Sequence, residues 1–307
     1  MLKLPLYNKT IFSNLGLVCT TKGEAIHYKT VTRKKLLSLS SSEQKQKLVE
    51  IYLANLEVLY NALCFCKKHS IRLYRMSSHA FPFADEKIGM DILNEAEFRF
   101  KLFHIGNTAK QYGVRIVTHP DQFVVLNSDS SSVIENSIKI LTTQARIMDK
   151  MKLPKSSWSL INIHGGKGNR KQKLIENIKK LPDSVYSRLT LENDERVYGS
   201  QDIFEICQAA TIPMVFDAHH HLVKEKLNSY DHPSMKEAVA LARLTWKKPE
   251  WQLVHISNGK EHLHDNKHSN LITSMPSSFQ YISWIEVEAK GKEESIFHLR
   301  QSNLSWT

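Results

Sequence analysis

The sequence predicts an α/β fold, a single closed (β/α)8 TIM barrel. Three observations favour it: eight short apolar runs recur along the 307 residues, helical segments separate them, and no long linker interrupts them. Barrels of alternating strands and helices often exceed about 250 residues as one domain. An open doubly wound sheet is the alternative, but no glycine-rich phosphate-binding motif follows the first strand. We expect one domain over residues 1–307, with residues 1–12 as an N-terminal extension.

The first half of the chain carries four expected strands, each an apolar run bounded by turn residues. They lie at residues 15–21, 71–78, 114–120 and 158–166. The expected helices between them lie at residues 40–68, 93–112 and 132–151. The first of these helices begins with small hydroxyl residues followed by an acid, and Gly113 fits the end of the second.

The second half repeats the alternation. Its expected strands lie at residues 189–195, 213–221, 251–258 and 281–288. Its expected helices lie at residues 173–181, 201–209 and 234–246, followed by a short, poorly periodic helix after residue 270. The sixth strand, Pro-Met-Val-Phe-Asp-Ala-His-His-His, is the most informative. Val215 and Phe216 suit a strand buried on both faces, and the run ends in a carboxylate and three imidazoles.

The charge balance favours a polyanionic partner. The chain has 42 Lys and Arg against 31 Asp and Glu, which gives a formal net charge of +11. We expect nucleic acid ahead of a membrane surface because no basic amphipathic anchor stands out; a merely basic protein is the alternative. No stretch approaches the roughly 20 apolar residues of a membrane span.

Cysteine usage and the first residues predict a cytoplasmic location. Cys19, Cys64, Cys66 and Cys207 show no metal-ligand spacing and are expected to be small core residues in a reduced compartment. The first ten residues lack a hydrophobic run long enough for a signal peptide. Because no repeat or coiled-coil seam stands out, we expect a monomer.

Acidic and imidazole side chains stand at the ends of the later strands. They are His119, His164, Glu192, Asp217 with His220, His255 and Glu288. Each alone is more often a hydrogen-bonded structural residue than a ligand. In a parallel barrel, however, all strands end on one face, where so many carboxylates and imidazoles would be costly without cations. The sequence therefore predicts an open cluster of divalent metal ions at the C-terminal face of the barrel.

The ligand types predict the metal and its chemistry. Imidazole and carboxylate suit Mn²⁺, Zn²⁺ or Fe²⁺ better than Ca²⁺. Two metals about 3.5–4 Å apart can bridge a phosphodiester, activate a bound water and stabilise the leaving oxygen. Catalysis is expected to rest on Glu192, Asp217, His255 and Glu288.

Two histidine-rich stretches require a choice of ligand. In the sixth strand we take His220, because strand geometry would point His219 and His221 in another direction. In the loop 261–270 we take His268, which stands just before the next helix. A solvated polar loop is the alternative for this second stretch.

Basic and aromatic residues near the same strand ends are expected to contact DNA. The basic loop 167–173 opens a helix, a favourable place for phosphate contacts, although it could be a solvated loop. In a distorted duplex, the ring of Phe123 could stack on bases and the amide of Gln122 could hydrogen-bond to bases that have lost their pairing partners. The alternative is that Phe123 is buried by packing. The expected DNA-contact residues are Gln122, Phe123, Lys167, Arg170, Lys171 and Lys290.

At this point the chain resembles the UV damage endonuclease family. The matching segments span about two-thirds of the chain in the right order. They are His119-Pro-Asp-Gln-Phe123, Ile163-His-Gly-Gly166, Leu191-Glu-Asn-Asp-Glu195, Asp217-Ala-His-His-His221, Leu253-Val-His-Ile256, His268 and Val287-Glu-Ala-Lys-Gly-Lys292. Leu-Glu-Asn-Asp-Glu followed by Asp-x-x-His-His and Glu-Ala-Lys-Gly-Lys is a specific combination.

The resemblance implies a barrel related to endonuclease IV with two or three divalent metals, Mn²⁺ first and Zn²⁺, Mg²⁺ or Co²⁺ as alternatives. The implied activity is ATP-independent incision of double-stranded DNA immediately 5′ to cyclobutane dimers, (6-4) photoproducts and some abasic sites. Gln122 and Phe123 fall where the family has a Gln-Tyr pair that probes the duplex. The implied metal ligands are His119, His164, Glu192, Asp217, His220, His255, His268 and Glu288.

The chain departs from the family pattern in three places. Many members carry a metal-binding His where Asp85 and Glu86 stand, so either carboxylate could substitute for it. Leu17 replaces a Tyr of the first strand, which puts a lesion contact in doubt. Leu253 replaces a Lys that can be carboxylated in some members, so that modification is not expected.

Two other functions remain open. A sugar isomerase or epimerase uses similar metal sites on this fold, but its small substrate would not explain the charge of +11. A damaged-DNA binder that has lost one metal would fit the departure at Asp85 and Glu86.

Overall fold

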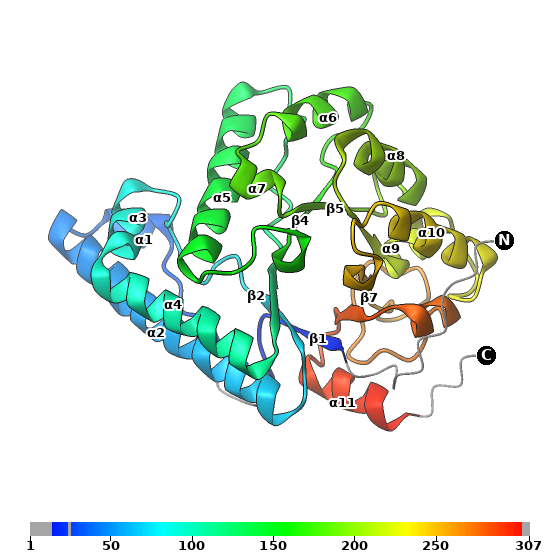
Figure 1. Ribbon diagram of the computed structural model, residues 1–307, viewed down its shortest axis with the longest axis horizontal. Helices are drawn as coiled ribbons and strands as arrows, with labels where there is room; N and C mark the ends of the chain where they lie inside the picture. Colours follow the sequence, from blue (N-terminus) through cyan, green and yellow to red (C-terminus); the bar gives the residue numbers. More distant parts are fainter. Residues whose placement is uncertain (1–13, 24–25, 303–307) are drawn as a thin grey trace.

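The computed structural model describes residues 14–23 and 26–302; the predicted N-terminal extension lies outside them (Figure 1). Eight parallel strands form a closed barrel in the order β1 to β8, and β8 pairs with β1. The strands are β1 (Leu15–Val18), β2 (Leu73–Met76), β3 (Arg115–Thr118), β4 (Ile161–His164), β5 (Leu189–Glu192), β6 (Met214–Asp217), β7 (Leu253–Ile256) and β8 (Trp284–Val287). The predicted TIM barrel is confirmed, with strands shorter than the apolar runs that predicted them.

Helices surround the barrel and bury its outer face (Figure 1). The α-helices are α1 (Arg33–Leu37), α2 (Ser41–Lys68), α3 (Lys87–Asn94), α4 (Ala96–Tyr112), α5 (Ser131–Lys150), α6 (Lys171–Lys179), α7 (Asp183–Tyr186), α8 (Ser200–Ala210), α9 (Ala218–Lys224), α10 (Pro233–Leu244) and α11 (Glu293–Gln301). Three 3₁₀ helices are η1 (Ser157–Ser159), η2 (Pro249–Trp251) and η3 (Ser277–Tyr281).

Two predicted helices differ from the structure. The predicted helix 93–112 is instead the end of α3 and the whole of α4, because Glu95 between them has an extended backbone (φ −61°, ψ 149°). No Gly or Pro marks this break in the sequence. The helix expected after residue 270 is the 3₁₀ turn η3, which is too short to show a helical apolar period.

The predicted sixth strand, 213–221, is wrong in its second half. The strand ends at Asp217, and the three histidines lie on α9. The change of structure has a local cause: the side chain of Asp217 accepts the backbone N–H of His220 at 2.7 Å and so caps the new helix. Because helical residues project about 100° apart, the three imidazoles point in three directions.

Helix α2 combines a capped start with a long buried stripe. Ser40 and Glu43 form a reciprocal capping box. The one polar residue of the stripe, Asn55, is satisfied by backbone groups of Lys29 and Ala80. Among the described residues α2 is the helix whose length and composition would let it cross a bilayer, yet 56% of its apolar window is buried in the protein. Packing in the core accounts for those apolar residues.

The barrel interior is apolar where the strands begin and polar where they end. A separate apolar cluster, including Leu73, Leu253 and Trp284, fills the lower end. Arg115 is buried there at 1% exposure and donates to the carbonyl oxygens of Ser157, Trp158 and Trp251 at 2.7–3.0 Å. Its guanidinium also lies 4.9 Å from the ring of Trp158 and 5.1 Å from that of Trp284.

Replacing Arg115 with Leu should lower the free energy of unfolding by about 3 kcal/mol or more, because three carbonyl groups lose their donors. Burial already lowers the pKa of Arg115 to about 9, so this cation is held by its hydrogen bonds and the Trp rings. Urea denaturation measures the effect. Arg72→Leu, at an exposed position, is the control and should change stability by less than about 0.5 kcal/mol. Equal stabilities of the two variants would contradict this account.

Candidate metal centre

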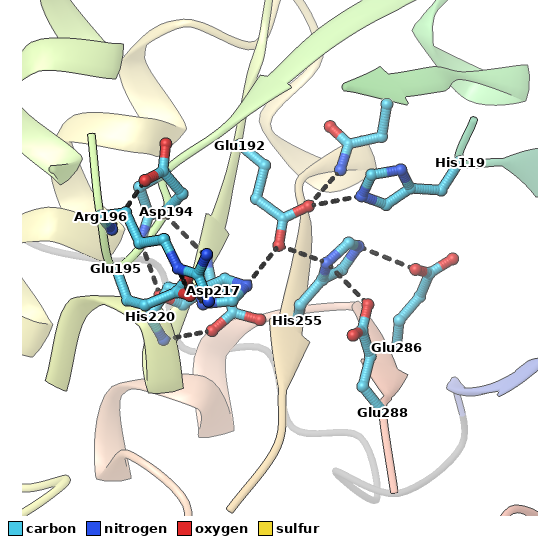
Figure 2. A network of polar contacts seen from close by, with 12 residues as sticks. His119, Glu192, Asp194, Glu195, Arg196, Asp217, His220, His255, Glu286 and Glu288 are labelled. Atoms are coloured by element: carbon cyan, nitrogen blue, oxygen red, sulfur yellow. Dashed lines mark hydrogen bonds and ion pairs between the residues drawn. The ribbon is translucent and has the colours of Figure 1, made fainter. Parts of the chain in front are cut away.

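Glu192 stands at the centre of the polar mouth (Figure 2). It ends β5 and is 1% exposed. Its Oε1 lies 2.9 Å from Nδ1 of His255, and its Oε2 lies 3.0 Å from Nε2 of His119. Asn162, from β4, donates to the same Oε2 at 2.5 Å. Glu192 thus joins side chains from several strands.

Three groups of side chains could each hold a metal ion. They are His119–His164–Glu192, Glu192–His255–Glu288 and Glu192–Asp217–His220, with the ligand atoms of each group within 4.8 Å of one another. Glu192 belongs to all three groups. Glu192 could therefore serve as a ligand in more than one of these potential sites, as a multinuclear metal centre would require.

Several buried polar atoms near the mouth lack hydrogen-bond partners, which fits the binding of a cation. Within the described part of the chain, His164 Nδ1, Asp217 Oδ2 and Glu286 Oε1 are buried without hydrogen-bond partners. Burying such atoms unpaired is unfavourable. An ion held by imidazole and carboxylate would satisfy His164 and Asp217, so the residues present suit Mn²⁺, Zn²⁺ or a similar ion.

The sequence reasoning missed two residues of the mouth, Arg75 and Glu286. Arg75, on β2, donates through Nε to Glu286 Oε2 at 2.7 Å, and its Nη2 contacts Glu286 and Glu288. Both residues are buried, at 8% and 1% exposure. Alternation could have revealed Glu286, because it stands two residues before Glu288 in the predicted strand 281–288 and therefore on the same expected face.

Glu286 also orients His255. Its Oε2 lies 2.8 Å from Nε2 of His255, so Nδ1 faces Glu192 at 2.9 Å and Glu288 at 3.2 Å. Although burial opposes charge, Glu192 and Glu286 raise the pKa of His255. Burial also opposes ionisation of Glu288, but Arg75 and His255 together lower the pKa of that carboxyl.

Helix α9 aims one of its three histidines at the cluster. His220 Nδ1 lies 2.9 Å from Glu195, and its Nε2 lies 3.8 Å from Glu192. His219 is instead bonded to Tyr230 and to a backbone carbonyl. His221 lies between the hydroxyls of Ser200 and Ser234, and burial lowers its pKa to about 4. The choice of His220 agrees with this geometry, but the reason for it was wrong. The three imidazoles point in different directions because they lie on a helix, whereas a strand was expected.

Three candidate ligands lie outside the groups. Asp85 is 3.7 Å from Lys139, and Glu86 pairs with Arg33, so each acid already has a cation. His268 is held by a β-bridge to Gly259 and belongs to none of the three groups. The backbone course of this loop decides the position of His268, and no pattern of residues in the loop predicts that course.

A cavity of about 540 Å³ opens above the cluster. Gln122 and Phe123 line it together with His119, Glu192 and Glu288. Phe123 is 75% exposed, so the alternative that packing buries its ring is wrong. The exposed ring and amide stand beside the candidate ligands, where a bound strand could contact both.

Of the basic residues expected to contact DNA, two are already in ion pairs and two are not. Arg170 is 2.6 Å from Asp129, and Lys171 binds two acids of α8 at 2.6 and 2.8 Å. In the described residues no acidic side chain pairs with Lys167 or Lys290. Lys167 and Lys290 are therefore the cations that remain available to a phosphate without first breaking an ion pair.

Leu17 and Leu253, the two leucines that differ from the family pattern, lie in apolar surroundings. Leu17 is fully buried in the main core between sheet and helices, so it does not face the mouth. Leu253 belongs to the apolar cluster inside the barrel.

Comparison with known proteins gives concordant matches. The model of the family UV-endonuclease UvdE matches residues 13–306. A protein of Nostoc sp. named UV DNA damage endonuclease is 52% identical over 288 residues, covering 93% of this chain and 89% of that protein. One of Deinococcus radiodurans with the same name is 45% identical over 289 residues, covering 93% and 94%. The crystal structure of SacUVDE matches with a TM-score of 0.78 at 28% identity, covering 94% of this chain and 98% of that one.

Proposed function

Because the chain belongs to the UV-endonuclease UvdE family, we propose that it is a metal-dependent DNA repair endonuclease acting on UV photoproducts in double-stranded DNA. The observation that carries the proposal is Glu192, one buried carboxylate common to three potential metal groups beneath an open mouth. The relatives named UV DNA damage endonuclease supply the substrate class. We further propose incision 5′ to cyclobutane dimers and (6-4) photoproducts, with abasic sites as additional substrates.

We propose two or three divalent ions, Mn²⁺ first, held by the three groups around Glu192. When bound, they would supply Lewis acidity and an activated water for phosphodiester hydrolysis. Glu192, Asp217 and Glu288 would supply the negative charge of the site, and Glu286 would keep Nδ1 of His255 directed into it. Arg75 would offset the carboxylates of Glu286 and Glu288, which limits their mutual repulsion.

Selectivity would come from the ease with which damaged DNA deforms. Phe123 and Gln122 at the rim could enter a duplex that kinks and unpairs at a lesion. Lys167 and Lys290 would hold phosphates, so binding should weaken as salt rises. We also propose that the protein acts in the cytoplasm as a monomer.

The direct test is to incubate the purified protein with Mn²⁺ and a duplex that contains one cyclobutane dimer. A nick immediately 5′ to the lesion, absent from the undamaged duplex, supports the proposal. Binding without a nick would favour a damaged-DNA binder, and fewer than two bound ions per chain would strengthen that alternative. Turnover of a free ketose without nicking would favour a sugar isomerase or epimerase.

Metal binding should release protons near neutral pH. Burial disfavours a charged His220, but Asp217, Glu195 and Glu192 outweigh burial and raise its pKa to about 10. His220 is therefore protonated at pH 7 and has to lose that proton to bind an ion. Metal affinity should accordingly rise with pH until His220 is neutral.

Calorimetry with Mn²⁺ in buffers of different ionisation enthalpy counts the released protons. His220→Ala should release about one proton fewer than the unchanged protein. His262→Ala, at an exposed histidine outside the three groups, should release the same number. Heats that do not depend on the buffer would contradict the prediction.

A further inference from the structure

A second basic hollow lies on the flank of the barrel, away from the mouth. Its volume is about 600 Å³, and it shares no residue with the cavity above the metal cluster. Helices α3, α4 and α5, grouped on one side of the barrel in Figure 1, form its walls. A Cβ at Gly106 would overlap the carbonyl oxygen of Met151, so α4 meets the end of α5 closely beside the hollow.

The cations of this hollow lack neutralising acids. In the described part of the chain no acidic side chain pairs with Arg99 or Arg146. Lys150 donates to the amide oxygen of Asn94 at 2.7 Å. The carboxylate that lines the hollow, Asp149, is already bound at 2.9 Å to buried Arg188.

The neighbouring cations act on the amine of Lys150. Partial burial, together with the positive charges of Arg99 and Arg146, lowers the pKa of the Lys150 amine. Like charges that converge beside a carboxylate already paired with Arg188 and Lys155 are unfavourable unless a further anion joins them. The hollow therefore has the electrostatics of an anion site.

Two aromatic rings flank the same cations. Phe100 and Phe103, one turn apart on α4, are 69% and 41% exposed. Exposed rings beside Arg and Lys form a platform on which bases stack while the cations contact phosphates. An acidic peptide would use the cations but would not require two planar rings.

We propose that this hollow binds single-stranded nucleic acid, with its phosphates at Arg99, Arg146 and Lys150 and a base stacked on Phe100. The site is separate from the metal cluster and has no part in hydrolysis. It would hold undamaged strand, because it contacts only the backbone and the face of a base, which every nucleotide presents.

The test is fluorescence anisotropy with a labelled oligothymidine of about 12 nucleotides, a length within the range of single-strand sites. The double variant Arg99→Ala/Arg146→Ala should bind it about tenfold more weakly, and Phe100→Ala about fivefold or more. Lys179→Ala/Lys180→Ala removes the same charge from exposed positions of the α6 end and should change affinity less than about threefold. Nicking of photoproduct duplex at saturating substrate should stay unchanged in every variant.

Equal losses in the two double variants would overturn the proposal, because overall charge would then explain the binding. Crosslinking with bromodeoxyuridine in the oligonucleotide provides a second measurement. Adducts on α4 support the hollow, whereas adducts confined to the Gln122–Phe123 rim overturn it. Binding of a polyglutamate peptide in place of the oligonucleotide would also overturn it, since the partner would then be an acidic protein.

Discussion

Replacing Glu192 with Gln should lower the rate of nicking by on the order of 10³-fold. The three potential metal-binding groups would all lose the one carboxylate that they share. Glutamine keeps the volume and one oxygen of Glu192 but removes the negative charge that His119 and His255 share. The bound metal content should fall in parallel, because all three groups include this carboxylate.

Single-turnover nicking and the metal content of the purified variant measure both effects. Glu237→Gln, at an exposed position on α10, is the matched control and should retain full activity and metal. If Glu192→Gln kept its metal and its rate, the three groups could not be the catalytic site. Loss of the rate with unchanged metal would instead assign Glu192 to the chemical step alone.

Replacing Glu286 with Gln should weaken metal binding by about 10–100-fold, the usual effect of removing a partner that orients a ligating histidine. The carboxylate accepts from Arg75 and lies 2.8 Å from Nε2 of His255. A neutral amide no longer offsets Arg75, which would then act more strongly on Glu288 and His255. Glu286 is thus a positioning residue, and its loss should affect the ion before it affects the fold.

Titration with Mn²⁺ measures the affinity, and circular dichroism shows whether the barrel persists. Ile285→Val is the control on the same strand; its side chain packs in the core outside the barrel and should leave affinity unchanged. Glu286→Asp should restore part of the affinity, because it returns the charge at a shorter reach. An unchanged affinity in Glu286→Gln would remove Glu286 from the metal site.

The fold could be predicted from the sequence because short apolar runs alternate with helical segments and several of the runs end in a carboxylate or an imidazole. Glu192 and Asp217 end their strands, and Glu288 directly follows β8, so counting along each run placed them on one face. The end of the sixth strand was harder to predict. Whether Asp217 continues a strand or caps a helix depends on a hydrogen bond to His220 that the residue order does not reveal.

The missed residues have a different explanation. Arg75 lies inside an apolar strand, where a charge looks like an outward-facing exception. Its contacts with Glu286 and Glu288, beyond the intervening strand β1, make it part of the mouth. Asp85 and Glu86 were candidates because they stand where many family members carry a metal-binding His, but in the structure they pair with Lys139 and Arg33. Contacts between distant strands and loops are what short-range patterns omit.

The two ends of the barrel interior differ in chemistry, and the candidate ligands lie at only one of them. Trp284 and Leu253 belong to the apolar cluster at the lower end, where Arg115 donates to backbone carbonyl oxygens. At the other end, the cavity lined by Gln122 and Phe123 reaches Glu192 and would give an ion a route to it. A DNA strand seated over that mouth would cover this route, so exchange of bound metal should be slower in the DNA complex than in the free protein.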